Sequence, residues 1–415
     1  MSSILGPFYY LFHIQELRAI VQWKTWRRPV HERHKAAESH DVKECFRFLA
    51  LTSRSFVAVV LELHPELFMP VCIFYLILRG LDTIEDDMTI SIGNKEVLLR
   101  NFHTHIDDES WTYNGNGPDE KDKELLVKFG CVTREFNKIK DEYKTVIKDI
   151  TKRMGNGMAD YVTDAEVRTT KDYELYCHHV AGLVGEGLTR LLIKANFADP
   201  KLLEEPKLME SMGQLLQQTN IIRDVHEDHK EKRYFWPKEV WGKYTDDFAK
   251  LFLRQHRQKA LQCSSEMVLI ALTRVEDCLI YMARVYDQSV FNFVAIPQSM
   301  AIATLELCFQ NPAIFERNIK ISKGAACQLM LESTKDMQSL CAAFMRYSKR
   351  IQEKNRPGDP LFHGINSACD KIERFAVTLF PNLNDTYDGK DPMYLIIVML
   401  MTLGAVMAVV LCYRG

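Results

Sequence analysis

The chain has no pronounced net charge, no closely paired cysteines and no segment of weight with the two-residue period of a β-strand. It carries 53 Lys and Arg against 55 Asp and Glu, so composition gives no reason to expect a nucleic-acid partner. Its eleven cysteines are scattered from Cys45 to Cys412 without a CxxC motif, which argues against a zinc ribbon or a redox pair. Reduced cysteines, used as small apolar residues, suit the cytosol. Without strand-period segments, the sequence predicts an all-α fold.

The N-terminal residues also lack the pattern that predicts a secretory signal peptide. No basic residue precedes the apolar residues 4–12, and Pro7 interrupts them. Residues 20–26, followed by the basic pair Arg27 and Arg28, predict either a membrane-proximal segment or an ordinary capping segment. Residues 1–40 are therefore expected to form an N-terminal segment outside the main domain.

One long uncharged stretch is present near the C-terminus. Residues 393–413 contain no charged side chain, and about 20 apolar residues are enough to span a bilayer core as a helix. A buried core helix is the alternative, but such a helix normally has a polar face. The sequence predicts a membrane anchor at residues 392–415, a linker at 381–391, and a catalytic domain at 41–380 that faces the cytosol.

The most informative stretch is a helix predicted over residues 75–87. Asp82, Glu85 and Asp86 lie at i, i+3 and i+4, so the three carboxylates share one face, with Arg79 one turn earlier. Three like charges on one face repel each other and need water, a basic partner or a divalent cation. Oxygen ligands without a nearby cysteine favour Mg²⁺ over zinc. A solvated acidic face is the alternative interpretation of a single such motif.

The motif occurs twice, which favours a metal site. Residues 217–228 again have a helical period and place Asp224, Glu227 and Asp228 at the same spacing, directly after Arg223. Two such helices can face each other across a pocket. They would then hold a diphosphate through bridging Mg²⁺, with arginines as additional clamps.

Other segments have features that suit the surroundings of such a site. Residues 41–63 predict a helix, and within it residues 52–56 form a short polar segment that either packs or binds an anion. Residues 107–123 predict a surface loop, and residues 124–161 predict a long helix. A helical stretch at 173–190 contains three glycines, which are tolerable where another helix or a flat ligand approaches closely. Residues 230–241 form a basic, aromatic turn that could close over an anion.

Together these segments resemble the eukaryotic squalene synthases, the farnesyl-diphosphate farnesyltransferases of the head-to-head prenyl synthase family. The resemblance rests on segments that keep the family's order over most of the chain: TSRSF, CIFYLILRGLDTIEDDMT, YCHHVAGLVGEGLTRL, QQTNIIRDVHED, YFWPKEVW and QSVFNFVAIPQSMAIATL. The two acidic motifs alone suit any head-to-head prenyl synthase. The segment FNFVAIPQ, together with the C-terminal anchor, indicates the squalene branch.

The resemblance implies an isoprenoid-synthase helical bundle around a central cavity, with a C-terminal transmembrane helix in the endoplasmic reticulum membrane. It implies that two farnesyl diphosphates are joined in two half-reactions, with Mg²⁺ (or Mn²⁺) and NADPH as cofactors. The first half-reaction gives presqualene diphosphate, and the second rearranges and reduces this intermediate to squalene. We expect a monomer. No Rossmann GxGxxG motif is present, so the expectation of NADPH rests on the resemblance alone.

Carried over residue by residue, the resemblance assigns roles to individual side chains. The expected metal ligands are Asp82, Glu85, Asp86, Asp224 and Asp228. The expected catalytic residues are Tyr176 for the first half-reaction, Phe291 and Phe293 around the carbocation of the second, and the aspartates Asp82 and Asp224. The positions that match phosphate or NADPH binding are Arg54, Arg79, Arg223 and Lys320. The expected substrate contacts are Ser53, Ser55, Phe56, Tyr75, Gln217, Asn220 and Arg233. Ser322 stands where the family often has a basic residue, which leaves open what holds the NADPH 2′-phosphate.

Three other functions remain open at this point. A related head-to-head synthase would stop at a cyclopropyl diphosphate or make phytoene without a reductant. A membrane-anchored phosphohydrolase would use the acidic helices together with His226 and His229, whose i, i+3 spacing suits zinc. A catalytically silent helical scaffold would tolerate replacement of the acidic residues.

Overall fold

Helices make up the regular elements in the part of the chain that the structure describes, apart from an isolated bridge between Ala198 and Val285. The computed structural model describes residues 13–33, 36, 38–53, 56–61, 63–162 and 167–383. The all-α prediction is confirmed for these residues. The predicted C-terminal anchor, most of its linker, Arg54, Ser55 and the side chain of Phe56 lie outside the described residues.

The first half of the chain contributes the helices α2 (Ile14–Val21), α3 (His40–Thr52), α4 (Phe56–Val60), α5 (Pro65–Asp86), α6 (Ile92–Asn101), α7 (Lys123–Val127), α8 (Gly130–Lys138), α9 (Asp141–Val162), α10 (Thr170–Cys177) and α11 (Leu183–Lys194). The second half contributes α12 (Pro206–Arg223), α13 (Val225–Lys230), α14 (Lys238–Trp241), α15 (Arg257–Leu272), α16 (Val275–Met282), α17 (Gln288–Cys308), α18 (Lys323–Ser333), α19 (Met337–Lys354) and α20 (Phe362–Leu379).

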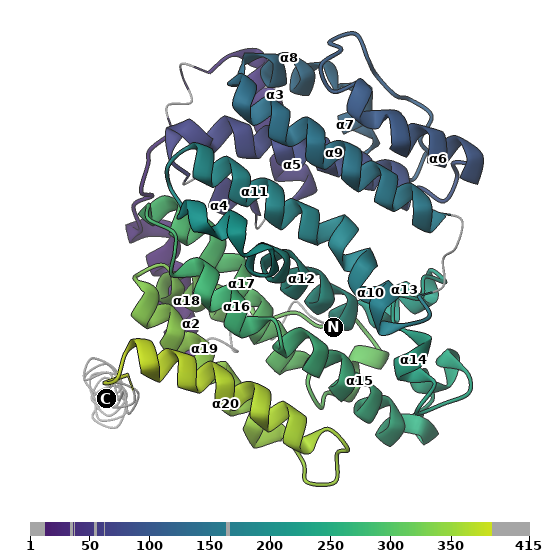
Figure 1. The fold of residues 1–415 in the computed structure, drawn as a ribbon, viewed down its shortest axis with the longest axis vertical. Helices are drawn as coiled ribbons and strands as arrows, with labels where there is room; N and C mark the ends of the chain where they lie inside the picture. The colour runs from purple at the N-terminus through teal and green to yellow at the C-terminus, as the bar shows by residue number, and fades with distance from the viewer. Residues whose placement is uncertain are drawn as a thin grey trace, which may run out of the picture.

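Helix α12 lies in the middle of the molecule (Figure 1). Helices α3 and α5 to α9 lie at one end, with α11 next to them, and α15 to α20 lie toward the other end. α12 packs against α11 and also against α15, α16 and α17. It therefore connects the two halves of the bundle, and the second acidic motif begins at its C-terminal end.

Helix α5, which carries the first acidic motif, is a core helix. Pro65 occupies its first turn, where a missing N–H costs no hydrogen bond, and His64 caps it by accepting from the Glu66 N–H at 3.2 Å. Among the described residues, α5 and α17 are long and apolar enough to cross a bilayer. The protein interior already buries 72% and 78% of their most apolar windows, so both serve as core helices here.

The glycine-rich stretch forms one continuous helical rod in which a π-helical turn, η4 (His178–Gly182), joins α10 to α11. A Cβ atom on Gly185 would lie 2.3 Å from the main-chain oxygen of Met209 on α12. On Gly187 it would lie 2.6 Å from the ring of Phe74 on α5. The glycines therefore let neighbouring helices approach closely, which was one of the two predicted reasons for them.

The structure corrects three predicted helix boundaries. The stretch 41–63 is divided into α3 and α4, since Ser53 leaves the helical conformation at φ −149° and ψ 97°. The stretch 124–161 consists of α7, α8 and α9, because α8 packs on α3 and α5 whereas α9 turns to pack on α6 and α11. The helix at 217–228 is interrupted at Asp224, between α12 and α13.

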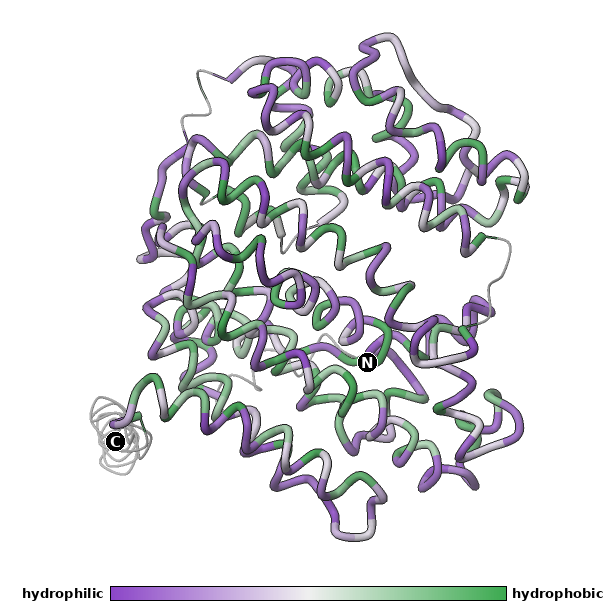
Figure 2. Tube along the Cα trace, in the orientation of Figure 1, coloured by the Kyte–Doolittle hydropathy of each residue, from purple (hydrophilic) through white to green (hydrophobic). Residues whose placement is uncertain are grey.

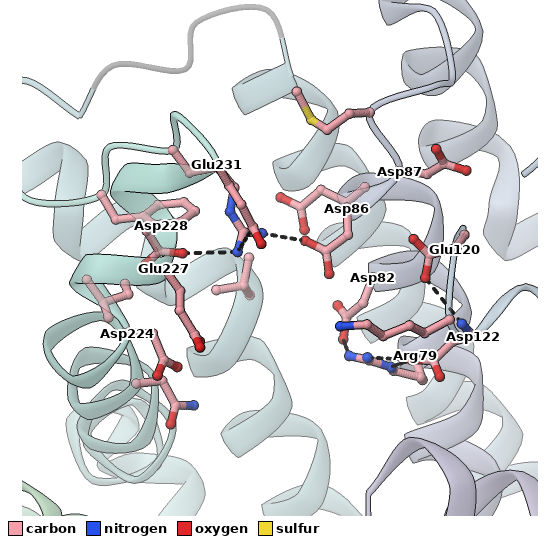
Figure 3. A pocket seen from close by; sticks show the side chains of 18 of the residues that line it. Arg79, Asp82, Asp86, Asp87, Glu120, Asp122, Asp224, Glu227, Asp228 and Glu231 are labelled. Atoms are coloured by element: carbon pink, nitrogen blue, oxygen red, sulfur yellow. Dashed lines mark hydrogen bonds and ion pairs between the residues drawn. The ribbon is translucent and has the colours of Figure 1, made fainter. Parts of the chain in front are cut away.

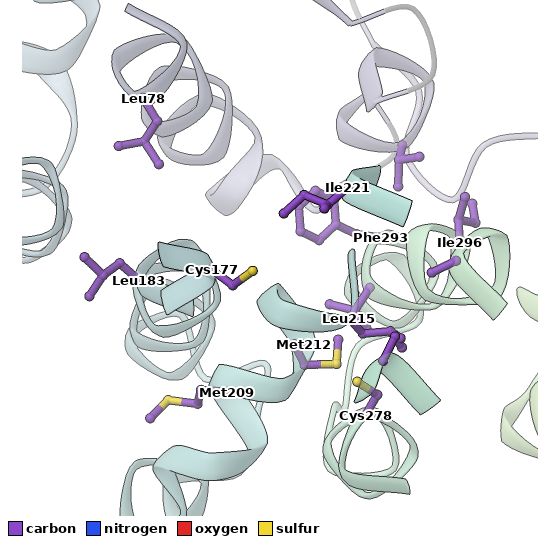
Figure 4. Close-up of a cluster of buried hydrophobic side chains, with 14 of the residues drawn as sticks. Leu78, Cys177, Leu183, Met209, Met212, Leu215, Ile221, Cys278, Phe293 and Ile296 are labelled. Atoms are coloured by element: carbon purple, nitrogen blue, oxygen red, sulfur yellow. The ribbon is translucent and has the colours of Figure 1, made fainter. Parts of the chain in front are cut away.

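Hydrophobic side chains fill the space between the helices. Figure 2 shows hydrophobic and hydrophilic residues alternating along the peripheral helix α20, whose buried side is formed by Ile365, Ala368, Cys369, Ile372 and Ala376. A further cluster lies between α12, α16 and α17, where Met212, Leu215 and Ile221 face Phe293 and neighbouring residues (Figure 4). This apolar cluster borders the polar site at Ile221, which also lines the pocket described next.

Candidate active site

The two acidic motifs lie on opposite walls of one pocket of about 940 Å³ (Figure 3). The last turns of α5 supply Asp82, Glu85 and Asp86 on one wall. Asp224 at the end of α12, with Glu227 and Asp228 on α13, supplies the other wall. The prediction that the two motifs face each other across a pocket is confirmed, and the break at Asp224 preserves this arrangement because the Asp228 N–H still donates to the Asp224 carbonyl at 3.0 Å.

Negative charge dominates this pocket. Eleven carboxyl groups line it against four basic side chains, so the site has a large excess of anionic groups. Burial raises the pKa of Asp82 to about 7 and that of Glu85 to about 8, and the charge of Asp86 adds to both increases. Burial likewise raises the pKa of Asp228 to about 7, against the opposing charge of Arg233. Such a site binds cations when its carboxyl groups are ionised.

Arg233 joins the two walls. Its guanidinium group donates to Asp86 Oδ1 and to Asp228 Oδ1, each at 3.0 Å, and lies 2.9 Å from Glu231 Oε2. The predicted basic turn therefore reaches across the pocket through one arginine. Its neighbour Trp236 is buried and donates its indole N–H to the Ile221 carbonyl at 3.3 Å, which fixes the turn against α12.

The remaining arginines of the site are already paired with carboxylates. Arg79 bonds Asp122 at 2.5 Å and lies 3.6 Å from Asp82. Arg223 bonds both oxygens of the adjacent Asp224, at 2.8 and 2.5 Å. These short contacts hold each guanidinium group at the rim of the acidic cluster, where a phosphate could replace a carboxylate as its partner.

Asn318 makes contacts with the second acidic motif that the sequence did not predict. Its amide donates to Asp224 Oδ1 at 2.9 Å and to Glu227 Oε2 at 2.7 Å. This bond attaches the segment that follows it, including Lys320, to the second acidic motif. An asparagine 94 residues along the chain from Asp224 carries no signal of this contact in the sequence.

A loop forms the third wall. Asp87 accepts hydrogen bonds from Thr89 and from the side chain of Asn116 and the Gly117 N–H, which draws residues 117–122 over the site. Burial opposes ionisation of Asp87, but these hydrogen bonds lower its pKa to about 2. The segment was predicted only as a surface loop. Its charged run DEKD at 119–122 was the available signal that it belongs to the site.

Tyr176 lines the pocket from the end of α10. Its ring is stacked on Phe235, with centroids 5.0 Å apart, and meets Tyr161 edge-on at 5.4 Å. Burial, together with the nearby charges of Glu85 and Asp86, raises the pKa of Tyr176 well above the usual value. The side chain is therefore a neutral phenol that can donate a hydrogen bond into the pocket.

The expected substrate contacts are divided between the pocket and its surroundings. Gln217 and Asn220 line the pocket with Arg233. Tyr75 lies one turn before Arg79 on α5 and is close to Thr52 and Ser53, outside the lining. Ser53 does not line the pocket either. Arg54, Ser55 and the side chain of Phe56 fall outside the described residues.

Three further expected functional residues do not line the pocket. Phe291 and Phe293 are 8% and 2% exposed on α17, where they pack in the hydrophobic core. Figure 4 shows Phe293 in this core. Lys320 is exposed outside the pocket. Ser322, the departure from the family pattern, caps α18 by accepting from the Ala325 N–H at 3.0 Å and donates to Glu16 at 2.5 Å. Its hydroxyl is thus engaged in joining α2 to α18.

The donor set suits a hard divalent ion. In the part of the chain that the structure describes, no three His, Cys, Asp or Glu side chains converge closely enough to hold a metal by themselves. Mg²⁺ does not require this, since it is bound by one or two carboxylates plus waters and phosphate oxygens. The pair His226 and His229 is less suited to bind a metal than the carboxylates, because the His229 ring is stacked flat on Phe252 with centroids 4.0 Å apart.

Comparison with known proteins agrees with this geometry. The family model for squalene/phytoene synthase matches residues 49–325, which include both acidic motifs. A squalene synthase of Phoma sp. is 65% identical and covers 100% of both chains, and one of Cochliobolus lunatus is 63% identical over 99% of this chain and 100% of its own. A solved structure of TcSQS with a ligand has a TM-score of 0.79 at 40% identity, covering 82% of this chain and 99% of the other.

Proposed function

Because this chain belongs to the squalene/phytoene synthase family and matches squalene synthases over its full length, we propose that it converts two farnesyl diphosphates into squalene. The reaction would proceed through presqualene diphosphate and require Mg²⁺, or Mn²⁺ in its place, and NADPH. The observation that carries the proposal is the pair of carboxylate motifs on opposite walls of one pocket. A diphosphate with its metal ions fits between such walls, whereas neither motif alone could enclose it.

The first acidic motif would bind the metal on one wall and the second motif on the other. Asp82, Glu85 and Asp86 would serve on α5, and Asp224 and Asp228 on the opposite wall. When bound, Mg²⁺ supplies the positive charge that stabilises a departing diphosphate. The observed excess of carboxyl groups, with pKa values raised by burial and by mutual repulsion, supports a resident cation at this place.

The arginines would then exchange partners. Arg233 holds Asp86 and Asp228 in the structure, and a cation bound to these carboxylates would leave its guanidinium group available for phosphate oxygens. Arg79 and Arg223 stand in the same relation to Asp122 and Asp224. The site would therefore pass from an internally paired state to one that binds the metal and the diphosphate together.

Tyr176 would act in the first half-reaction. Its phenol is neutral and lines the pocket near Glu85, so it can donate a hydrogen bond to the leaving diphosphate or pass on a proton. The stacking of its ring on Phe235 limits the directions in which the hydroxyl can point. Both properties suit a group that assists departure of an anion from an allylic carbon.

The second half-reaction would extend toward the apolar cluster. Phe293 lies beside Ile221, which forms part of the pocket wall, so a small opening there would place an aromatic face near a substrate cation (Figure 4). NADPH supplies a hydride when bound. Lys320 fits its phosphate groups because the lysine is exposed and Asn318 ties its segment to Asp224. Ser322 does not fit this role, since its hydroxyl already bonds Glu16.

We further propose that residues 392–415 anchor the protein in the endoplasmic reticulum membrane as a single span, with the catalytic domain in the cytosol. Support comes from the uncharged residues 393–413. Both the substrate tails and the product are hydrocarbons, so an enzyme held at a membrane can pass its product directly to lipid. A chain ending at Asp391 should stay active without detergent, whereas loss of folding would place the segment in the core.

The test is to incubate the full chain in detergent with farnesyl diphosphate and Mg²⁺, with and without NADPH, and to identify the products by chromatography and mass spectrometry. Squalene should form with NADPH and presqualene diphosphate should accumulate without it. A phytoene-type product, or a cyclopropyl diphosphate that NADPH does not consume, would place the protein on another branch of the family. Release of phosphate without carbon–carbon bond formation would refute synthase activity.

A further inference from the structure

Lys95 on α6 is the one lysine or arginine among the fully buried side chains of the described residues, at 6% exposure. It does not line the pocket. Its Nζ atom donates to the main-chain oxygen of Glu85 at 2.6 Å, from behind the first acidic motif. A buried ammonium group is costly unless its surroundings compensate the charge, so this position requires a specific reason.

The reason lies in the end of α5. The last four carbonyl groups of a helix have no partner within the helix, and the helix dipole leaves partial negative charge there. Glu85 is in the last turn of α5, and the chain becomes extended at Asp87, with φ −72° and ψ 101°. Lys95 therefore donates to the otherwise unpaired carbonyl of Glu85, and the side chains of Glu85 and Asp86 line the pocket.

The carboxylates at the end of α5 also interact with the charge of Lys95. Burial lowers the pKa of Lys95, while the negative charges of Glu85, Asp87 and Asp86 favour its protonated form. The ammonium group is thus compensated by the same carboxylates that repel one another in the pocket. The Lys95 ammonium group offsets part of that repulsion without lining the pocket in which a ligand would bind.

We propose that Lys95 is a positioning residue for the first acidic motif, holding the last turn of α5 so that Glu85 and Asp86 bind a divalent cation together with a diphosphate. This inference rests on the proposed metal-dependent function. Loss of Lys95 has two opposing effects on the cation: removing a nearby positive charge favours binding, and releasing the turn disfavours it. Position dominates, because residues that orient metal ligands typically change metal affinity by about 10–100-fold when they are replaced.

The experiment measures Mn²⁺ binding to the full chain in detergent, in the presence of inorganic diphosphate, from the electron paramagnetic resonance signal of free Mn²⁺. Lys95→Met removes both the hydrogen bond and the charge and should weaken Mn²⁺ binding by about tenfold. Lys95→Arg keeps a charged donor and should retain most of the affinity. Activity at saturating Mg²⁺ should recover partly in Lys95→Met, whereas activity at low Mg²⁺ should not.

Lys354→Met is the matched control. Lys354 donates to the main-chain oxygen of Glu306, at 2.6 Å, in the last turn of α17, and it does not line the pocket. Its replacement removes the same kind of helix-end bond, together with an ion pair to Glu306 Oε1 at 2.7 Å. It should lower the melting temperature while leaving Mn²⁺ affinity unchanged. A loss of Mn²⁺ affinity in Lys95→Met that Lys354→Met does not share would separate positioning from general destabilisation.

Each outcome has a defined meaning. Unchanged or tighter Mn²⁺ binding in Lys95→Met would overturn the proposal, and tighter binding would show that Lys95 acts only through its charge. If Lys95→Met does not fold, Lys95→Gln, which keeps a shorter donor without the charge, is measured in its place, with weakened binding in support and unchanged binding against. Failure of the unmodified protein to bind Mn²⁺ with diphosphate would refute the proposed metal site itself and not this inference alone.

Discussion

Asp86 on α5 and Asp228 on α13 accept hydrogen bonds from the same guanidinium group, each at 3.0 Å from Arg233. The two acidic motifs are therefore connected through Arg233. A single arginine partly neutralises both walls and holds them at a fixed separation. We propose that binding of a cation and a diphosphate replaces this contact.

Replacing Arg233 should consequently affect the metal-free protein most. Arg233→Gln leaves Asp86 and Asp228 without their shared counter-charge and should lower the melting temperature by about 2 °C, since such partly exposed ion pairs contribute little. Mg²⁺ with diphosphate should reduce the difference in melting temperature between Arg233→Gln and the unmodified protein, because the cation supplies the missing positive charge. Calorimetry with and without these ligands measures this. Arg100→Gln is the control, since Arg100 also contacts two carboxylates, Glu96 and Asp160, but away from the pocket; a ligand-dependent difference there too would contradict the interpretation.

The carboxylates themselves should be indispensable for turnover. Asp82→Asn and Asp224→Asn each remove a charged oxygen ligand without changing side-chain size, and each should reduce kcat by a factor of about 10² or more. Far-ultraviolet circular dichroism should show an unchanged helical fold. Asp107→Asn, which disturbs a surface pair with Lys148, should retain normal activity. Full activity in either pocket variant would eliminate the metal-clamp model.

The raised pKa values predict a pH dependence with a definite sign. Asp82 and Glu85 titrate near 7 and 8 in the folded protein, well above their ordinary values, so the folded state binds protons more tightly than the unfolded chain. Their contribution to stability is therefore full below about pH 4 and is lost as the pH rises to about 8. Comparing melting temperatures of the metal-free unmodified protein and Asp82→Asn across this range isolates the effect. The melting temperature of Asp82→Asn, relative to that of the unmodified protein, should rise with pH. A difference in melting temperature that stays constant with pH would mean that Asp82 titrates normally.

The affinity for Mg²⁺ should increase with pH, whereas the stability of the metal-free protein decreases. The ligands must lose their protons before they bind Mg²⁺, so affinity should increase from about pH 6 to pH 8. Isothermal titration at several pH values would show this increase together with proton release into the buffer. The metal therefore restores stability over the same pH range in which ionisation removes it.

The two half-reactions should respond to different residues. Tyr176→Phe loses only the hydroxyl and should slow formation of presqualene diphosphate by about 10²-fold, so neither intermediate nor squalene accumulates. Phe293→Leu loses an aromatic face worth about 0.5–2 kcal/mol to a cation, which slows a step by up to roughly thirtyfold. The intermediate should then accumulate even with NADPH. Phe344→Leu, at a buried core position on α19, is the packing control. Equal loss of both half-reactions in Phe293→Leu would mean that Phe293 is only a core residue.

The local geometry of the first acidic motif was predictable from sequence, because side chains at i, i+3 and i+4 share a helix face wherever the helix lies. That the two motifs face each other across a pocket was also predicted, because two such motifs could together hold a diphosphate through divalent cations. In contrast, the contact of Arg233 with Asp86 joins residues 147 positions apart, and no periodicity specifies such a pair. The same holds for Asn318 and for the loop that Asp87 draws over the site.

Other features depended on the competition between local and tertiary interactions. The period of residues 217–228 is helical throughout, but the bonds of Asp224 to Arg223 and Asn318 accompany a break that the period does not predict. Lys95 had no sequence signal, because an isolated lysine in a polar helix usually faces solvent. Phe291 and Phe293 were expected beside a substrate cation, and the structure places both side chains in the hydrophobic core and outside the pocket lining.

The most direct test of the central claim is to locate the metal. A crystal of the protein grown with Mn²⁺ and a non-reactive thio-analogue of farnesyl diphosphate would reveal the ion positions through anomalous scattering. The account predicts Mn²⁺ ions at both walls, bound by Asp82, Glu85 or Asp86 on one wall and by Asp224 or Asp228 on the other. Diphosphate oxygens should lie between the ions, and Arg233 should no longer contact Asp86. Mn²⁺ on one wall only, or diphosphate bound outside this pocket, would contradict it.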